Sequence, residues 1–255
     1  MGPTIFDLSG KVALVTGGSK GIGLGMAEAL GKNGASVAIA SRGKEDLVKA
    51  ENELKEKGIN VKGFQVDVTN KQKVEQLVEA IVAEFGRLDI LINNAGTNIR
   101  KPLVEVEEED WDFIIGTNLK GIFLTGQAVA KQLIKQGEGG KIINISSILG
   151  ATGMSNQTSY SASKGGINQL TKVWADELAA YGIQVNAIGP GYIKTPMTED
   201  WLADQERLKA IVDKTMVGRV GTLEDLAGPV VFLSSESSSY ITGQILYVDG
   251  GWTAK

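Results

Sequence analysis

Short runs of apolar, mostly β-branched residues alternate along the chain with longer stretches in which apolar residues recur every three or four positions. A short run that is apolar throughout predicts a strand buried on both faces, and the longer spacing predicts an amphipathic helix. The predicted strands are, in order, 12–16, 36–40, one within 61–68, 88–93, 141–146, 184–188 and 245–248.

The stretches between these runs predict helices at 22–33, 44–57, 70–85, 108–136 and 159–181, with a last helix before the final strand. Gly34 and Gly58 end the first two, and Thr69 or Asn70 caps the third. Alternating strands and helices build a parallel sheet covered on both faces. The pattern therefore predicts an α/β fold, a single doubly wound Rossmann-type domain of seven strands over residues 1–255. A small helical substrate lid is expected at about 195–220.

The first strand runs directly into the glycine-rich segment 16–23. Its glycines permit a tight turn and close approach of a pyrophosphate to backbone N–H groups, and the following helix points its positive end at the phosphates. The spacing is Gly-x-x-x-Gly-x-Gly and differs from the commoner dinucleotide fingerprint. A turn with packing glycines is the plainer alternative. The predicted cofactor contacts in this segment are Gly17, Ser19, Lys20, Gly21, Ile22 and Gly23.

The end of the second strand distinguishes between two nicotinamide cofactors. A carboxylate there would bind the ribose 2′-hydroxyl of NAD, but the sequence has Ser41-Arg42-Gly43. Arg42 can fork onto a 2′-phosphate, Ser41 can donate to it, and Lys20 faces the same corner. NADP(H) is therefore the predicted cofactor. NAD(H) is the alternative if the two cations are only solvated surface residues.

Tyr160 and Lys164 lie four residues apart, on one face of the predicted helix 159–181. An ammonium beside a phenol favours the phenolate, so Lys164 is expected to lower the pKa of Tyr160 and make it an acid or base near neutral pH. Ser147 is expected to hydrogen-bond the oxygen that exchanges the proton. The plainer alternative is a surface tyrosine beside a solvated lysine.

Composition narrows the chemistry further. The chain has no Cys and no His, which removes thiol chemistry, Ser-His-Asp hydrolysis and His-ligated zinc, and no metal site is predicted. A net charge of −4 does not favour nucleic acid or an anionic membrane as partner. No apolar run approaches the ~18 residues of a membrane span. A cytoplasmic enzyme acting on a small molecule is expected.

Taken in order along the chain, these motifs resemble those of the short-chain dehydrogenase/reductase family, and the resemblance covers essentially the whole chain. Its pieces are 16–23, Asp67-Val68, 93–96, Asn118, Ser147, Tyr160, Lys164, 190–195 and 248–251. The resemblance implies hydride transfer between a nicotinamide and a ketone or secondary alcohol, and a homotetramer. A nucleotide-binding regulator on the same fold is the non-enzymatic alternative.

The family's roles carry over to this chain position by position. Ser147 would polarise the substrate carbonyl, Tyr160 would exchange the proton, and Lys164 would bind the nicotinamide ribose, while Asn118 would hold a water of the proton relay. These four are the expected catalytic residues. The further positions assigned to the cofactor are Asp67, Val68, Asn94, Ala95, Gly96, Pro190, Gly191, Ile193, Thr195 and Met197, together with Tyr160 and Lys164.

Two segments, 93–102 and 248–255, resemble sugar-acid dehydrogenases that act on gluconate or 2-deoxy-gluconate. Arg100 would clamp a substrate carboxylate through its planar guanidinium. The alternative is that Arg100 faces solvent or a neighbouring subunit. The expected substrate residues are Arg100, Leu149, Met154, Tyr192 and Trp201.

Two other activities stay open. A 3-oxoacyl-acyl-carrier-protein reductase carries basic residues 21 positions after and 22 before its catalytic tyrosine, where this chain has Tyr181 and Glu138. A carboxylate there repels an acidic carrier protein, although Lys131, Lys135 and Lys141 partly restore positive charge. A broad-specificity ketone reductase is the third candidate, because the expected pocket wall is largely apolar.

Overall fold

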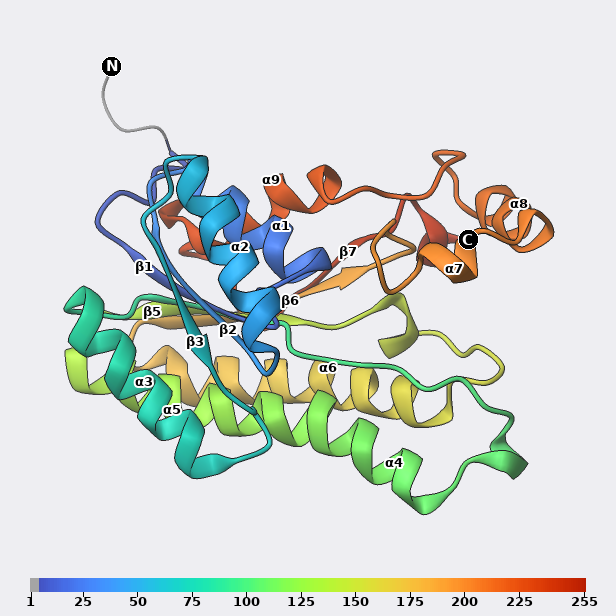
Figure 1. Cartoon of the computed structure of the whole chain (residues 1–255), viewed down its shortest axis with the longest axis horizontal. Helices are drawn as coiled ribbons and strands as arrows, with labels where there is room; N and C mark the ends of the chain where they lie inside the picture. The colour runs from blue at the N-terminus through green and yellow to red at the C-terminus, as the bar shows by residue number, and fades with distance from the viewer. Residues whose placement is uncertain (1–4) are drawn as a thin grey trace.

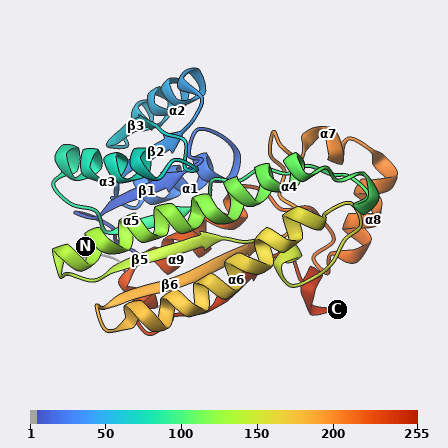
Figure 2. The same cartoon turned by 90° about the horizontal axis from the view of Figure 1, so that it is seen from below.

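The computed structural model describes residues 5–255 as a sheet between two layers of helices (Figures 1 and 2). All seven strands pair in parallel, in the order β3-β2-β1-β4-β5-β6-β7. They are β1 (Val12–Thr16), β2 (Ser36–Ser41), β3 (Val61–Gln65), β4 (Ile90–Asn93), β5 (Gly140–Ile145), β6 (Ile183–Pro190) and β7 (Ile245–Val248). The predicted fold class is confirmed. The strand order reverses between β1 and β4, where sheets of this kind open a crevice for ligands.

Alternate residues of each strand enter two separate cores. In β1, Ala13 and Val15 face one core, while Val12 and Leu14 face the other. The first core is covered by α1 (Gly21–Lys32), α2 (Lys44–Glu56) and α9 (Glu224–Ser234). The second is covered by α3 (Lys71–Phe85), α5 (Gly121–Gln136) and α6 (Thr158–Ala179). Figure 1 shows the two groups of helices on opposite sides of the sheet.

Local signals place most helix ends close to where they are predicted. Asn70 caps α3, since its side chain accepts from the Lys73 amide at 3.0 Å. Gly86, with φ of +83°, ends the same helix in the left-handed conformation that favours glycine. Short-range hydrogen bonding thus accounts for these boundaries without help from the rest of the fold.

The predicted helical stretch 108–136 is confirmed, but it is not α-helical throughout. It divides into α4 (Glu108–Ile115), a π-helical turn (Gly116–Lys120) and α5. Inside the turn, the Asn118 side chain accepts from the Thr97 amide and donates to the Thr97 carbonyl, both at 2.8 Å. Single π turns inside α-helices often occur at functional sites. A distant loop therefore stabilises the extra residue, which the apolar periodicity alone does not reveal.

The segment predicted as a lid contains two short helices, α7 (Glu199–Leu202) and α8 (Gln205–Lys214). Figure 1 places both beyond the sheet, near the C-terminus. Short turns complete the structure at Leu103–Glu105, Ile148–Gly150, Glu236–Ser238 and Trp252–Ala254. Within residues 5–255, no helix combines the length and apolar character needed to cross a membrane. The same residues contain no group of three or more His, Cys, Asp or Glu placed to hold a metal ion.

Candidate active site

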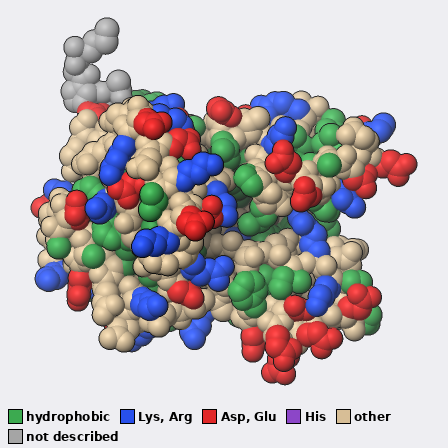
Figure 3. Space-filling view, in the orientation of Figure 1, with side chains coloured by type: hydrophobic (Ala, Val, Ile, Leu, Met, Phe, Trp, Pro, Cys, Tyr) green, Lys and Arg blue, Asp and Glu red, His purple; other side chains and the backbone are tan. Residues whose placement is uncertain are grey.

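A cavity of about 620 Å³ opens at the carboxyl edge of the sheet, over the crevice between β1 and β4. Figure 3 shows this side of the molecule hollowed near its centre, with Lys and Arg side chains around the hollow. Every residue predicted to contact the cofactor lies in the cavity lining: Gly17, Ser19, Lys20, Gly21, Ile22, Gly23, Ser41, Arg42, Asp67, Val68, Asn94, Ala95, Gly96, Tyr160, Lys164, Pro190, Gly191, Ile193, Thr195 and Met197. The fold thus gathers these segments into one cleft.

The glycine loop joins β1 to α1 at one wall of this cleft. Gly17 has φ of +65°, and a Cβ on Gly23 would lie 2.2 Å from the Gly17 carbonyl oxygen, so only glycine permits this packing of helix against loop. Among the described residues, no side chain caps α1, and its first turn carries no acidic residue. The N-terminal amides of α1 are therefore available to an anion, as a pyrophosphate site requires.

At the far end of the cleft, Lys20, Ser41 and Arg42 line one corner, as the sequence predicts. The structure adds a carboxylate: Asp46 of α2 lines the same corner and accepts from Lys20 Nζ at 2.8 Å. Sequence reasoning missed Asp46, because it lies beyond the end of β2 and only the course of α2 brings it back. The corner stays positive through Arg42, which forms no ion pair among the described residues.

Ser147, Tyr160 and Lys164 meet where β5 and α6 adjoin the cleft. Lys164 Nζ lies 5.5 Å from the centre of the Tyr160 ring and donates to the Ile145 carbonyl at 2.8 Å. Ser147 Oγ accepts from the Leu149 amide at 3.1 Å. The hydroxyl, the phenol and the ammonium are thereby held on adjoining walls of the cleft, as a proton-transfer site needs.

The expected shift of the tyrosine is wrong in direction. Burial raises the pKa of Tyr160, and the hydrogen bond with Ser147 and the charge of Arg100, which act the other way, do not offset it. Burial also lowers the pKa of Lys164 to about 8. The Lys164 ammonium donates to a backbone carbonyl and not to the phenol. Desolvation is therefore the main cause of the pKa shifts of both Tyr160 and Lys164. The lysine, and not the tyrosine, therefore titrates near neutral pH.

Asn118 is buried and lies outside the lining of the cleft. Besides its two bonds to Thr97, its amide nitrogen lies 3.4 Å from Ser163 Oγ. These contacts tie the π turn to the loop after β4 and to α6. The predicted role of Asn118 in holding a relay water stays a prediction.

None of the five predicted substrate residues belongs to the lining of the cleft, but four of them form one cluster. Tyr192 stacks on Trp201 with ring centres 5.3 Å apart and donates to Met154 Sδ at 3.3 Å. The Arg100 guanidinium lies 4.9 Å from the centre of the Trp201 ring. Leu149, the fifth, is buried and takes part in none of these described contacts.

Two residues of this cluster were not predicted as substrate residues. Trp252 meets Tyr192 edge-on at 5.1 Å, and the Arg207 guanidinium lies 4.9 Å from the centre of the Trp201 ring. Trp252 comes from the end of the chain and Arg207 from α8. The one sequence signal for Arg207 is its place in the predicted lid, shortly after Trp201.

Known proteins resemble this chain over nearly its whole length. A family model described as "Enoyl-(Acyl carrier protein) reductase" matches residues 17–253. A gluconate 5-dehydrogenase from Gluconobacter oxydans is 43% identical, with 98% of each chain covered. A 3-oxoacyl-acyl-carrier-protein reductase from Thermotoga maritima is 42% identical over 96% of this chain and 98% of its own.

Among solved structures, a gluconate 5-dehydrogenase from Burkholderia cenocepacia, in complex with NADP and tartrate, superimposes with a TM-score of 0.94. It is 36% identical, with 98% of each chain covered. The motifs lie in the expected order, the sheet has the expected topology, and the sequence similarity extends over the whole fold. The chain therefore belongs to the short-chain dehydrogenase/reductase family of oxidoreductases.

Proposed function

We propose that this enzyme interconverts the keto and hydroxy forms of a sugar acid such as gluconate, using NADP(H), with Tyr160 as acid and base. The observation that carries the choice of substrate is Arg100. Its guanidinium lies beside Trp201, outside the cavity lining but near enough that its positive charge acts on the Tyr160 phenol. Within residues 5–255 it forms no hydrogen bond or ion pair of its own, so it is available to a carboxylate.

The cleft fits NADP(H). The uncapped N-terminus of α1 suits a pyrophosphate, and Arg42 with Ser41 and Lys20 suits the 2′-phosphate. Asp67, Val68 and the segment 94–96 would hold the adenosine half, and the segment 190–197 with Lys164 the nicotinamide half. The NADP named in the Burkholderia complex supports this choice. When bound, NADPH supplies a hydride from its nicotinamide ring.

Side chains of the protein carry out the proton transfer. Ser147 donates a hydrogen bond to the substrate carbonyl oxygen, and Tyr160 gives its proton to that oxygen as negative charge develops there. Burial keeps Tyr160 protonated, as reduction requires, and Lys164, with a pKa of about 8, can return the proton. In oxidation the same groups act in reverse, and Tyr160 accepts the proton.

Similarity to gluconate 5-dehydrogenases supports the sugar-acid substrate, and the tartrate named in the Burkholderia complex is itself a hydroxy acid. Similarity to the Thermotoga reductase keeps a carrier-protein thioester as the second candidate. The carboxylate of Glu138 is bound by Arg87 at 2.8 Å, at the edge of the sheet opposite the cleft. That position therefore offers no basic residue where the thioester reductases carry one, which disfavours this candidate.

Steady-state rates distinguish the sugar-acid substrate from the carrier-protein thioester. The purified enzyme is assayed with NADPH and with NADH, against 5-keto-gluconate, an acetoacetyl thioester and a cyclic ketone. We expect the highest kcat/KM with NADPH and 5-keto-gluconate. A preference for the thioester or for the cyclic ketone would overturn the proposed substrate, and a preference for NADH would overturn the proposed cofactor.

Arg100→Gln tests the carboxylate contact directly. Loss of a charge-assisted hydrogen bond should raise KM for 5-keto-gluconate about tenfold or more, with little change for the cyclic ketone. Lys101→Gln is the matched control, because Lys101 is the next residue, carries the same charge and is bound to Asp110. Equal effects of the two substitutions would contradict a specific role for Arg100.

We also infer a homotetramer. Large apolar side chains are exposed on the expected surfaces: Trp111 and Phe123 on α4 and α5, Val173 on α6 and Leu246 on β7. Such side chains support burial against further copies of the chain. Light scattering should give the mass of four chains, and a monomer at assay concentration would contradict the inference.

A further inference from the structure

The indole of Trp201 has two guanidinium groups beside it. The guanidinium carbons of Arg100 and Arg207 each lie 4.9 Å from the centre of the Trp201 ring. Arg100 belongs to the loop after β4, and Arg207 to α8 in the lid region. One aromatic side chain therefore connects a cation of the loop after β4 with a cation of the lid.

This indole is held from several sides. Tyr192 stacks on it at 5.3 Å with an interplanar angle of 12°, and Tyr192 in turn meets Trp252. Arg207 Nη1 donates to the Trp201 carbonyl oxygen at 3.0 Å, which ties α8 to α7. Because the indole is fixed in this way, it also fixes where both guanidinium groups lie relative to the cleft.

The charges of this cluster are not balanced. Within residues 5–255, Arg207 has one acidic partner, Asp204, at 3.5 Å, and Arg100 has none. Burial is the main cause that lowers the pKa of Arg100, and the positive charge of Arg207 contributes to the same shift. Two like charges beside one indole repel each other, and an anion between them would relieve that repulsion.

The dimensions suit a carboxylate. Since both guanidinium carbons lie 4.9 Å from one ring centre, they are at most about 10 Å apart. A carboxylate that accepts from two guanidinium groups separates their carbons by roughly 8 Å, because each such hydrogen bond is about 2.8 Å long. The separation that a shared carboxylate requires lies within this bound.

We propose that Arg207 is a specificity-determining residue, which binds the substrate carboxylate jointly with Arg100 and so makes α8 part of the substrate site. This inference rests on the proposed sugar-acid substrate. A neutral ketone offers no negative charge to either guanidinium and leaves both charges unpaired. The enzyme therefore selects for anionic ketones at the lid, apart from the groups that carry the proton.

The test is a kinetic comparison of Arg207→Gln with the native enzyme, using NADPH with 5-keto-gluconate or with the neutral ketose fructose. We expect KM for 5-keto-gluconate to rise about tenfold or more. We expect kcat for 5-keto-gluconate, and both kcat and KM for fructose, to stay nearly unchanged. Arg207→Lys keeps the positive charge but loses the planar guanidinium, so its KM for 5-keto-gluconate should lie between those of the native enzyme and Arg207→Gln. Lys209→Gln is the matched control on α8, where Lys209 is exposed and bound to Asp213.

The two arginines are also expected to act together. If both bind one carboxylate, the rise in KM for the double variant Arg100→Gln/Arg207→Gln should be smaller than the product of the single rises. A direct binding readout is thermal unfolding with gluconate: the native protein should gain melting temperature, and Arg207→Gln should gain much less.

The outcomes separate this inference from the proposed function. If the native enzyme reduces neither 5-keto-gluconate nor a related keto acid, the proposed function fails, and the inference fails with it. If the native enzyme does so and Arg207→Gln behaves like Lys209→Gln, only the inference fails. An equal rise in KM for fructose and for 5-keto-gluconate would show that Arg207 only supports the lid, which also overturns it.

Discussion

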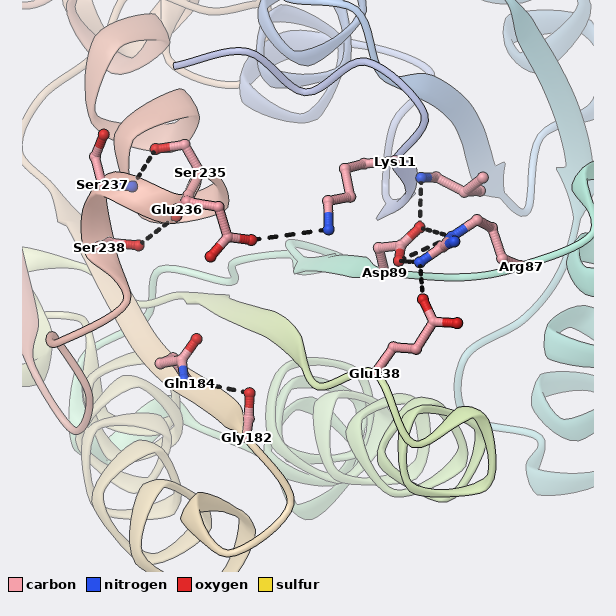
Figure 4. A network of polar contacts seen from close by, with 11 residues as sticks. Lys11, Arg87, Asp89, Glu138, Gly182, Gln184, Ser235, Glu236, Ser237 and Ser238 are labelled. Atoms are coloured by element: carbon pink, nitrogen blue, oxygen red, sulfur yellow. Dashed lines mark hydrogen bonds and ion pairs between the residues drawn. The ribbon is translucent and has the colours of Figure 1, made fainter. Parts of the chain in front are cut away.

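The two edges of the sheet use charged side chains in opposite ways. At the amino edge, Arg87 binds Asp89 at 2.6 Å and Glu138 at 2.8 Å, and Asp89 also accepts from the Val12 amide (Figure 4). At the carboxyl edge, Arg42 and Arg100 form no ion pair among the described residues; Arg42 lines the cleft, and the charge of Arg100 acts on Tyr160 in its wall. Charges that are satisfied within the chain stabilise the fold, and charges left unpaired at a cleft are available to a ligand.

At each edge, a lysine departs from this contrast between paired and unpaired charges. At the amino edge, the side-chain Nζ of Lys141 on β5 is buried without a hydrogen-bond partner among the described residues, and burial lowers the pKa of this lysine. At the carboxyl edge, Lys20 is paired with Asp46, although both are exposed. The contrast between the edges is therefore strong for Arg100 and Asp89 and weak for Lys20.

The largest effect is expected at the carboxyl edge, from Tyr160→Phe. The substitution removes the atom that exchanges the proton and keeps the ring, so kcat should fall by about 10²–10⁴-fold. NADPH affinity and the melting temperature should change little. Steady-state kinetics and a fluorescence titration with NADPH measure both. Tyr181→Phe, at an exposed tyrosine near the end of α6, should be neutral. Retained turnover in Tyr160→Phe would refute its role.

At the amino edge, Asp89→Ala is expected to lower stability and to leave kcat unchanged. It leaves the Val12 amide and the Arg87 guanidinium without their buried partner and should cost about 2–3 kcal/mol of unfolding free energy. Urea unfolding measures this, and kcat should stay the same. Glu138→Gln, at an exposed partner of the same arginine, should cost less than about 0.5 kcal/mol. If Asp89→Ala lost kcat but kept the unfolding free energy of the native protein, the contrast between the two edges would be refuted.

The pH dependence should separate activity from stability. Lys164 has a pKa of about 8 in the fold and 10.5 ordinarily, so kcat/KM for ketone reduction should decline as pH rises through about 8. Between those values the unfolded chain binds more protons at this lysine, so the stability of the native protein relative to Lys164→Met should rise. Rate profiles and urea unfolding across this range measure both. A decline of the rate beginning only near pH 10 would contradict the assignment.

The smallest effect is expected from Asp46→Asn. It frees Lys20 for the 2′-phosphate, and because exposed ion pairs are weak, KM for NADPH should fall only about twofold to threefold. KM for NADH should not change. Glu45→Gln makes the same change of charge in the same turn of α2 and is the control. If the ratio of the two KM values is unaltered in Asp46→Asn, Asp46 has no part in choosing the cofactor.

Much of the fold and of the cofactor cleft could be predicted from local features. β1 begins and ends where its apolar run does, and Asn70 and Gly86 set the ends of α3 through contacts within a few residues. The order of the motifs then predicted which segments share an edge, because the strands of a parallel sheet all end on the same side.

The tertiary structure decided what depends on contacts between distant segments. Thr97 stabilises the π turn around Asn118, and a buried backbone carbonyl, not the phenol, receives the Lys164 ammonium. The pairing of Lys20 with Asp46, and the placement of Arg100 and Arg207 beside Trp201, likewise join elements far apart in the chain. The sequence by itself determined the fold class and the chemical groups at the site, since hydrophobic periodicity and glycine geometry are local. Only the tertiary structure decided their partners and pKa values, because pairing and desolvation depend on which distant groups the fold places beside them.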